Sequence, residues 1–234
     1  MHTYNVEVVV SHVGPDCLMR PYEIVRIMQD ASLQWLNTEP TMHAWMKEND
    51  ILMVVTSRQV DILRQPKLDE KLQVRTSVYN YRSFLGYRNT CVYDEQGQPV
   101  AQCWCMGAWV DTNTGKATRV PQQVVDSLVM DDEVPMEKLS HKVKPPACAP
   151  VEAPAFTVRR SETDLYGHVN NMRYVRMAWE LLPEDFTVHR MRIEHKGQAL
   201  PGEVIAPLVY TEDGKCTVAL NAADGSLFTI VEFS

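Results

Sequence analysis

The chain has 234 residues, 45% of them hydrophobic and 23% charged, with a formal net charge of −7 at pH 7. This composition is typical of a globular protein and excludes a disordered or fibrous one, and the negative charge argues against nucleic acid as a partner. No uncharged stretch suits a membrane-spanning helix and the first residues lack a secretory signal, so we expect a cytoplasmic protein without a membrane span.

The first half of the chain predicts a strand, a long helix and then further strands. Residues 4–10 alternate between apolar and polar side chains, and a turn follows at residues 14–16. After Pro21, apolar residues recur at helical spacing as far as Trp35. Pro21 suits a first helical turn because the N–H that it lacks would be unpaired there. Runs rich in β-forming residues follow at 53–63, 71–81, 87–93 and 100–110.

The second half repeats this order of elements. Residues 155–159 predict a short strand, and a helix that begins at about Asn171 turns one apolar face inward, made of Met172, Val175, Ala178, Trp179 and Leu182. Strands are predicted at about 189–195, 203–211, 216–222 and 226–233. The similar stretches 65–70 and 198–203 also follow their helices at matching places. Internal duplication is the simplest explanation of this repetition.

Prolines gather between the two halves and predict an extended connector on the surface. We therefore divide the chain into an N-terminal repeat (1–130), a proline-rich linker (131–154) and a C-terminal repeat (155–234). Each repeat is expected to be an α+β unit in which a long helix packs on an antiparallel sheet. The two sheets are expected to join edge to edge, because this removes two exposed strand edges.

The sequence predicts no metal site. Cys103 and Cys105 are the only closely spaced cysteines, and their spacing puts both on one face of a strand instead of forming the pairs that zinc requires. His189 and His195 flank a predicted strand, but no third ligand accompanies them. The signature motifs of common hydrolases and nucleotide-binding proteins are absent as well.

The most distinctive segment begins at Asp164 and reads D-L-Y-G-H-V-N-N-M-R-Y. Asp164 lies four residues before His168, in a tight loop that precedes the predicted helix. Gly167 allows a backbone conformation that other residues rarely adopt, and Asn170 or Asn171 is a good N-cap. The N–H groups at the helix start would polarise a carbonyl oxygen, while Asp164 activates water or attacks and His168 positions the substrate or a proton. In the structural alternative, Asp164 only closes a turn and Asn170 only caps the helix.

The string D-x-x-G-H-V-N-N-x-x-Y at a helix start resembles the signature of hotdog-fold thioesterases. Together with the duplicated layout it resembles the acyl-acyl carrier protein thioesterases of plants and bacteria, a double-hotdog family, over nearly the whole chain. In the first half the resemblance rests on residues 28–31, 64–66, Arg88 and 109–111. It implies a hydrolase of fatty acid biosynthesis and lipid metabolism, which cleaves the thioester between a fatty acyl chain and the phosphopantetheine of acyl carrier protein without a cofactor. The second repeat would carry the chemistry and the first would house the acyl chain.

Carried over position by position, the resemblance makes Asp164 and His168 catalytic, with Gln198 a third catalytic residue at the position of the family's glutamate. The residues around them are expected to bind substrate: Tyr166, Gly167, Val169, Asn170 and Asn171. Two further differences concern Tyr166, where the family has asparagine, and Ala199, where it has cysteine. A glutamine cannot act as a base and an alanine cannot act as a nucleophile, so Asp164 would carry most of the chemistry.

Three interpretations of the function stay open. The leading one is hydrolysis of fatty acyl-acyl carrier protein. The second keeps the fold and changes the reaction, to hydrolysis of acyl-CoA or hydration of an enoyl thioester. The third is an acyl-binding module that does not hydrolyse. Because acyl carrier protein is acidic, cations near the site are expected to receive it: Arg159, Arg160, Arg173, Arg176, Arg190 and Lys196. Trp35, Trp45 and Met46 are residues at which an acyl tunnel could end, and the sequence leaves a homodimer open.

Overall fold

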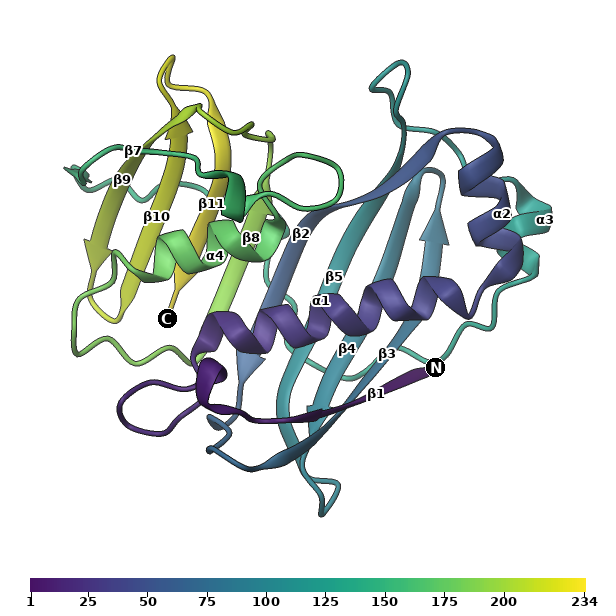
Figure 1. Ribbon diagram of the computed structural model, residues 1–234, viewed down its shortest axis with the longest axis horizontal. Helices are drawn as coiled ribbons and strands as arrows, with labels where there is room; N and C mark the ends of the chain where they lie inside the picture. The colour runs from purple at the N-terminus through teal and green to yellow at the C-terminus, as the bar shows by residue number, and fades with distance from the viewer. The chain divides into compact units, whose positions relative to one another are not determined.

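The computed structural model describes residues 1–234 and separates into two compact units (Figure 1). The first unit comprises Met1–Thr56 and Val60–Lys138, and the second comprises Ser57–Gln59 and Leu139–Ser234. Each unit packs helices against strands that pair in antiparallel fashion, as the α+β prediction requires. The predicted ranges 1–130, 131–154 and 155–234 stay predictions about the repeats, because the compact units divide the connector between them.

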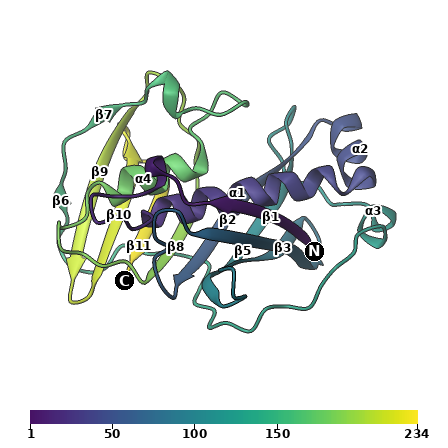
Figure 2. The same ribbon diagram turned by 60° about the horizontal axis from the view of Figure 1, so that its bottom comes forward.

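The first unit contains three α-helices and five strands, apart from Ser57–Gln59 of β2, which belong to the second unit. They are β1 (His2–Glu7), α1 (Pro21–Asn37), α2 (Pro40–Glu48), β2 (Ile51–Ile62), β3 (Lys71–Arg82), β4 (Leu85–Tyr93), β5 (Pro99–Asp111) and α3 (Gln122–Asp126). The strands lie in the order β1-β3-β4-β5-β2. The first strand ends earlier than predicted, because Val10 already begins a 3-10 turn, Val10–His12. The short helices α2 and α3 were not predicted; they contact each other beyond the end of α1 (Figure 2).

Helix α1 forms the second layer of this unit and packs on β1, β3 and β4 (Figure 1). Pro21 occupies its first turn, as predicted. The predicted apolar stripe is buried throughout: Ile24, Ile27, Met28, Ala31 and Trp35. Burial of each large side chain is worth about 1.5–3 kcal/mol relative to exposure, so this stripe holds the helix to the sheet.

The second unit contains one α-helix and short strands. They are β6 (Val151–Glu152), β7 (Phe156–Thr157), α4 (Asn171–Trp179), β8 (Arg190–His195), β9 (Val204–Glu212), β10 (Lys215–Ala222) and β11 (Leu227–Phe233). The strand order is β8-β11-β10-β9, and β6 and β7 both pair with β9. Helix α4 ends before Leu182, which was predicted on its inward face. Leu182 lies instead in a turn, where its N–H donates to the Trp179 carbonyl oxygen at 3.1 Å. Pro183 follows directly and cannot continue the helix.

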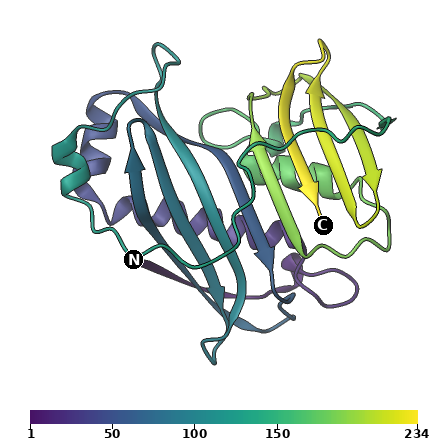
Figure 3. The ribbon, with the colours of Figure 1, turned by 180° about the vertical axis from the view of Figure 1, so that it is seen from behind.

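The connector lies along both units without regular structure apart from β6. In the first unit, Val134 N donates to Asn89 Oδ1 at 3.0 Å and Lys138 contacts Tyr79. Asn89 lies beside Arg88, whose side chain contacts Trp35 of α1, so Asn89 is on the sheet face away from the helix. Figure 3 shows the connector crossing that face.

The two units repeat the same loop before their first long helix. In the first unit, Gly14 N donates to Leu18 O at 3.0 Å and Cys17 N to Gly14 O at 3.0 Å. In the second, the corresponding bonds run from Asp164 N to His168 O at 2.9 Å and from Gly167 N to Asp164 O at 3.0 Å. The matching bonds confirm the predicted duplication, and they place Asp164 where the first unit has Gly14.

A second segment also repeats, after each helix. Lys67 N donates to the Glu70 carboxylate at 2.9 Å, and Leu200 N donates to the Glu203 carboxylate at 2.6 Å. The stretches 65–70 and 198–203, which look alike in the sequence, therefore have the same local structure.

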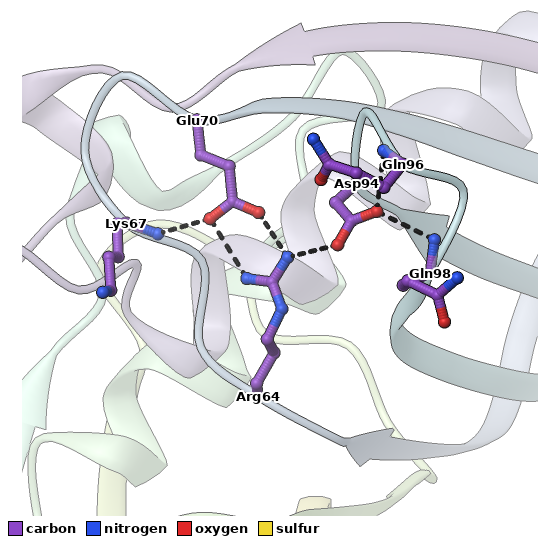
Figure 4. A network of polar contacts seen from close by, with 6 residues as sticks. All are labelled: Arg64, Lys67, Glu70, Asp94, Gln96 and Gln98. Carbon is purple, nitrogen blue, oxygen red and sulfur yellow. Dashed lines mark hydrogen bonds and ion pairs between the residues drawn. The ribbon is translucent and has the colours of Figure 1, made fainter.

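Arg64 ties two loops of the first unit together (Figure 4). Its guanidinium donates to the two carboxylate oxygens of Glu70 at 2.5 and 3.1 Å and to Asp94 at 2.9 Å. The Arg64 hydrogen bonds lower the pKa of Glu70 below its ordinary value. The pKa of Asp94 is lowered too, first by the backbone N–H of Gln98 and then by Arg64. Both carboxylates are therefore held in their charged form.

Candidate active site

The loop between Thr163 and Asn170 is the element that positions the predicted catalytic pair. Asp164 N donates to His168 O at 2.9 Å, and Gly167 N donates to Asp164 O at 3.0 Å. Gly167 has a φ of +78°, a conformation that other residues adopt only with strain. A Cβ at Gly167 would meet no atom within 4 Å, so the requirement for glycine comes from the backbone angle and not from crowding.

The Asp164 carboxylate closes its own turn. Its Oδ1 accepts a hydrogen bond from Tyr166 N at 2.9 Å, and the side chain is half-buried. A carboxylate offers two oxygens, so this bond leaves Oδ2 for a second partner. The turn-closing role considered from the sequence is therefore present, and it does not exclude a chemical role for the same residue.

Asn170 is the N-cap of α4. Its Oδ1 accepts from Met172 N at 3.0 Å, and its own N–H donates to Glu162 O at 3.0 Å. This identifies Asn170, and not Asn171, as the capping residue. The cap uses one of the N–H groups at the helix start, and the positive end of the helix dipole faces the loop that precedes Asn170.

Ala199 joins this loop to the helix. Val169 N donates to Ala199 O at 3.0 Å, and Ala199 N donates to Tyr174 Oη at 2.7 Å. Ala199 and Tyr174 are 0% and 1% exposed, so their bond is shielded from water. Burial raises the pKa of Tyr174 to about 12, which keeps its hydroxyl neutral. The peptide group of Ala199 therefore fixes the distance between the Asp164–His168 loop and α4.

The predicted residues are brought together through their backbones. Val169 N donates to Ala199 O, and this bond brings the two segments together. His168 directly precedes Val169 and Gln198 directly precedes Ala199, so the two predicted residues come close to each other. No hydrogen bond joins the side chains of Asp164, His168 and Gln198, and Gln198 is exposed while the other two are half-buried. The three side chains thus share one region of the surface without forming a hydrogen-bonded triad.

The predicted substrate-binding residues fall into two groups. Leu165 and Tyr166 are 81% and 50% exposed at the tip of the loop, so the Tyr166 ring does not fill the core beneath it. Gly167 is exposed as well, and Asn171 is half-buried in the first turn of α4. Val169, in contrast, is buried and packs the loop against the core.

Three of the six predicted cations near the loop lie beside acidic side chains. Arg173 pairs with Glu162 at 3.7 Å, Arg176 with Glu180 at 3.8 Å and Lys196 with Glu194 at 3.3 Å. Arg159 and Arg160 are exposed and form no ion pair. The charges of these two adjacent arginines are therefore not offset by an acidic neighbour.

Sequence reasoning assigned no role to Tyr174, although it closes the distinctive motif. The signal that could have found it is its position four residues after Asn170, which turns it toward the sheet with the apolar face of α4. That the Tyr174 hydroxyl accepts from Ala199 N could not be predicted in this way, because the two residues are 25 positions apart in the chain.

The structure contains neither a cluster of metal-ligating side chains nor a helix that could span a membrane. No three His, Cys, Asp or Glu side chains come together as a metal site, and all the cysteines are free. No helix is long and apolar enough to cross a membrane.

Comparison with protein families gives two matches that together cover most of the chain. Residues 1–128 match the model described as the acyl-ACP thioesterase N-terminal domain, and residues 149–225 match the acyl-ACP thioesterase C-terminal domain. Among curated proteins, the chain is 22% identical over 229 residues to the chloroplastic dodecanoyl-[acyl-carrier-protein] hydrolase of Umbellularia californica, covering 89% of this chain. The chain spans 59% of the length of that relative.

Solved structures show the same fold. An acyl-ACP thioesterase from Bacteroides thetaiotaomicron superposes with a TM-score of 0.88 at 20% identity, covering 99% of this chain and 96% of that chain. The 12:0-ACP thioesterase from Umbellularia californica gives a TM-score of 0.85 at 19% identity, covering 99% and 95%. These likenesses confirm the predicted double-hotdog fold class.

Proposed function

The chain belongs to the acyl-ACP thioesterase family, and from this we propose that it hydrolyses fatty acyl-acyl carrier protein thioesters to free fatty acid and carrier protein. The curated relative from Umbellularia californica is named as a hydrolase of dodecanoyl-[acyl-carrier-protein]. The observation that carries the proposal to particular residues is the Asp164–His168 loop, which is tied at Val169 to Ala199 and leads directly into the capped start of α4.

In the proposed reaction, Asp164 Oδ2 removes a proton from a water molecule whose oxygen attacks the thioester carbonyl carbon. Helix N-terminal N–H groups polarise the carbonyl oxygen as it gains negative charge. The tetrahedral intermediate then collapses, the carbon–sulfur bond breaks, and the thiolate takes the proton back from Asp164. A direct attack by Asp164 would instead form an acyl anhydride that water cleaves in a second step.

The other predicted site residues would act on the reactants by position. His168 would hold the acyl group or the proton in transit, and Gln198 would hold the water or the carboxylate by hydrogen bonding. Tyr166 and Gly167 lie at the exposed tip of the loop, where the phosphopantetheine arm would arrive. Asn171 would contribute its N–H at the helix start. Val169 would act by supporting the loop from below, since its side chain is buried.

Arg159 and Arg160 support acyl carrier protein as the partner, because they are exposed and form no ion pair. An acidic carrier would meet these charges without competing with acids of the same chain. Its association should therefore weaken as salt is added. We further propose that the second repeat carries the chemistry and that the first repeat houses the acyl chain.

A non-hydrolysing acyl-binding module is the second function that we consider. It is favoured by Gln198 and Tyr166, which stand where the family has glutamate and asparagine. The two functions differ in what happens to the substrate: the enzyme releases fatty acid and free carrier thiol, whereas the binding module returns the acyl thioester intact.

Incubation of the protein with a mixed pool of C8–C18 acyl-acyl carrier proteins, followed by mass spectrometry, tests the proposal. We expect free fatty acid and carrier with a free thiol. The same pool of acyl-CoA thioesters compares the two carriers, and a loss of enoyl absorbance without thiol release would identify a hydratase. Intact thioesters with every chain length and carrier would contradict the hydrolase.

A further inference from the structure

Several polar side chains lie on the sheet face that α1 covers in the first unit. The strand register places Thr76 opposite Thr90, Val78 opposite Arg88 and Tyr81 opposite Gly86, which aligns Thr90, Arg88 and Gly86 along one face of β4. This face is turned toward α1, because the Arg88 guanidinium lies 4.0 Å from the centre of the Trp35 ring. Arg88 also donates to Thr76 Oγ1 at 3.1 Å. A polar track therefore runs through a layer that is otherwise apolar.

Two hydrogen-bonding atoms at the end of this track have no partner. They are the Tyr81 hydroxyl oxygen and the Trp109 indole nitrogen, and both are buried. The two rings lie side by side, with centroids 5.0 Å apart, and Trp109 is 4% exposed. Buried polar groups almost always find a partner, so two adjacent exceptions require an explanation.

The surroundings of these atoms suit an alkyl chain. Apolar side chains of α1, α2, β2, β3, β5, α3 and the residues that flank α3 form one cluster around them: Trp35, Met42, Met46, Ile51, Val78, Trp109, Val120, Val124 and Leu128. Met53 packs against the same cluster. Unbranched methionine side chains repack at low cost, so Met42, Met46 and Met53 could move aside for a chain that enters the cluster.

A pair of glycines lets two side chains of the cluster lie directly on the sheet. Gly86 of β4 lies opposite Gly107 of β5, so this strip of the sheet carries no side chains. A Cβ on Gly86 would lie 2.4 Å from Trp109 Cη2, and a Cβ on Gly107 would lie 2.8 Å from the Met53 sulfur. The Trp109 ring and the Met53 thioether therefore lie directly on the sheet backbone, where a displaced methionine would leave room.

Charge decides which polar group fits. Arg88 is the buried cation of this layer, and its guanidinium already contacts the Trp35 ring and donates to Thr76 Oγ1. Burial raises the pKa of Glu39, the half-buried acid at the start of α2, above its ordinary value, although positive charges that include Arg88 act in the opposite direction. A neutral oxygen would thus enter at less cost than a carboxylate, which would have to be buried without a cation of its own.

We propose that the cluster under α1 and α2 binds acyl chains that carry a neutral oxygen, a hydroxyl or a carbonyl, which accepts hydrogen bonds from Tyr81 Oη and Trp109 Nε1. The indole nitrogen can only donate, and the phenol can donate as well, so the two atoms together are suited to an acceptor oxygen. This inference deepens the proposed function, because it assumes that the first repeat houses the acyl chain, and it names a class of substrate for that site.

The test is equilibrium binding of free fatty acids to the full chain, measured by calorimetry, so that no hydrolysis is needed. One saturated fatty acid is compared with a set of the same length that carries a single hydroxyl group at successive carbons. We expect at least one hydroxylated acid to bind as tightly as the saturated acid or more tightly. In an apolar pocket without donors, every hydroxyl would weaken binding, because it would lose its hydrogen bonds to water.

Tyr81→Phe removes only the hydroxyl oxygen, and Trp109→Phe removes the indole nitrogen. We expect each variant to weaken binding of the preferred hydroxylated acid about ten-fold relative to the saturated acid, a typical effect of leaving one polar group unpaired. Tyr79→Phe is the matched control, because the Tyr79 hydroxyl accepts from Lys138 at 3.0 Å in the connector and makes no contact with the cluster. Its ratio of the two affinities should equal that of the parent protein.

The outcomes separate this inference from the proposed function. If the saturated acid binds and the ratio is unchanged in both variants, oxygen recognition is overturned while acyl binding stands. If every hydroxyl weakens binding to the parent protein, the inference is overturned in the same way. If no fatty acid binds at all, the inference falls together with the acyl-housing role of the first repeat. Should Trp109→Phe fail to fold, Tyr81→Phe decides the matter alone.

Discussion

Asp164 and Asp224 make the same hydrogen bond at two turns of one unit. Asp164 Oδ1 accepts from the N–H of Tyr166 and Asp224 Oδ1 from the N–H of Ser226, each at 2.9 Å. In both cases the donor lies two residues further along the chain. The second turn joins β10 to β11 and lies far from the Asp164–His168 loop in sequence. Its aspartate therefore reproduces the structural role of Asp164 without the neighbours that the proposed reaction would need.

This pair gives a matched test of the proposed base. Asp164→Asn keeps an oxygen that can accept from Tyr166 N but cannot take a proton from water. We expect its turnover of acyl-acyl carrier protein to fall about a hundred-fold or more, the usual contribution of a general base. Asp224→Asn should hydrolyse at the parental rate. Equal rates for Asp164→Asn and the parent would move the chemistry to another residue.

Removal of the Tyr174 hydroxyl should separate positioning from binding. In Tyr174→Phe the buried N–H of Ala199 loses its acceptor, which costs about 1–3 kcal/mol of unfolding free energy. Because Ala199 holds the loop at Val169, we expect kcat to fall while KM changes little. Urea unfolding and steady-state kinetics measure the two effects. Tyr210→Phe serves as the control, since Tyr210 is a buried tyrosine of the same unit that makes no hydrogen bond through its hydroxyl. A change in KM alone would argue against a positioning role.

His195 should make stability depend on mildly acidic pH. Burial first, and then the positive charge of Arg58, lower the pKa of His195 to about 3. The unfolded chain binds a proton there near the ordinary pKa of 6.5 while the folded chain does not, so this contribution is fully present above pH 6.5 and is lost as the pH falls toward 3. His195→Gln, which can still bond Thr229, should flatten the dependence of unfolding free energy on pH in that window. Parallel curves for variant and parent would show that His195 does not titrate with folding.

The ion pairs of Arg64 should make stability depend on pH in a more acidic range than His195 does. The pKa values of Glu70 and Asp94 are both lowered in the folded protein, so their contribution to stability is present above the ordinary carboxyl pKa of about 4 and is lost as the pH falls through the lowered values. We expect Arg64→Gln to lower the melting temperature at pH 7, and the difference from the parent to shrink below pH 4. Arg119→Gln, at another arginine of the same unit that bonds only Ser83, should melt like the parent at both pH values.

Much of the fold could be predicted because it follows from local patterns. The stripe from Ile24 to Trp35 identified α1, and runs of β-forming residues identified the long strands. Helix α2 was missed because only Met42 and Met46 are buried in it, which is too few residues to show a helical period. Helix α4 was expected to be longer because Leu182 continues its spacing, although the chain turns before Pro183.

The candidate site also has parts that the sequence indicates and parts that only the structure shows. The turn at Gly167 and the cap at Asn170 are local structures, and their residue types indicate them directly. The bond from Ala199 to Tyr174 joins distant parts of the chain, so no spacing rule could reveal it. The sequence does not say whether the Tyr166 ring is buried or exposed, and only the position of the loop tip places it in solvent.

The loop of the first unit has the backbone bonds of the Asp164–His168 loop but carries Gly14 and Leu18 where the second has Asp164 and His168. The main-chain course of this loop is therefore independent of the two side chains that we hold responsible for the reaction. A chain in which both residues are exchanged loses the hydrogen bond from Tyr166 N to Asp164, yet it should still fold, so inactive descendants of this protein could persist with the same architecture.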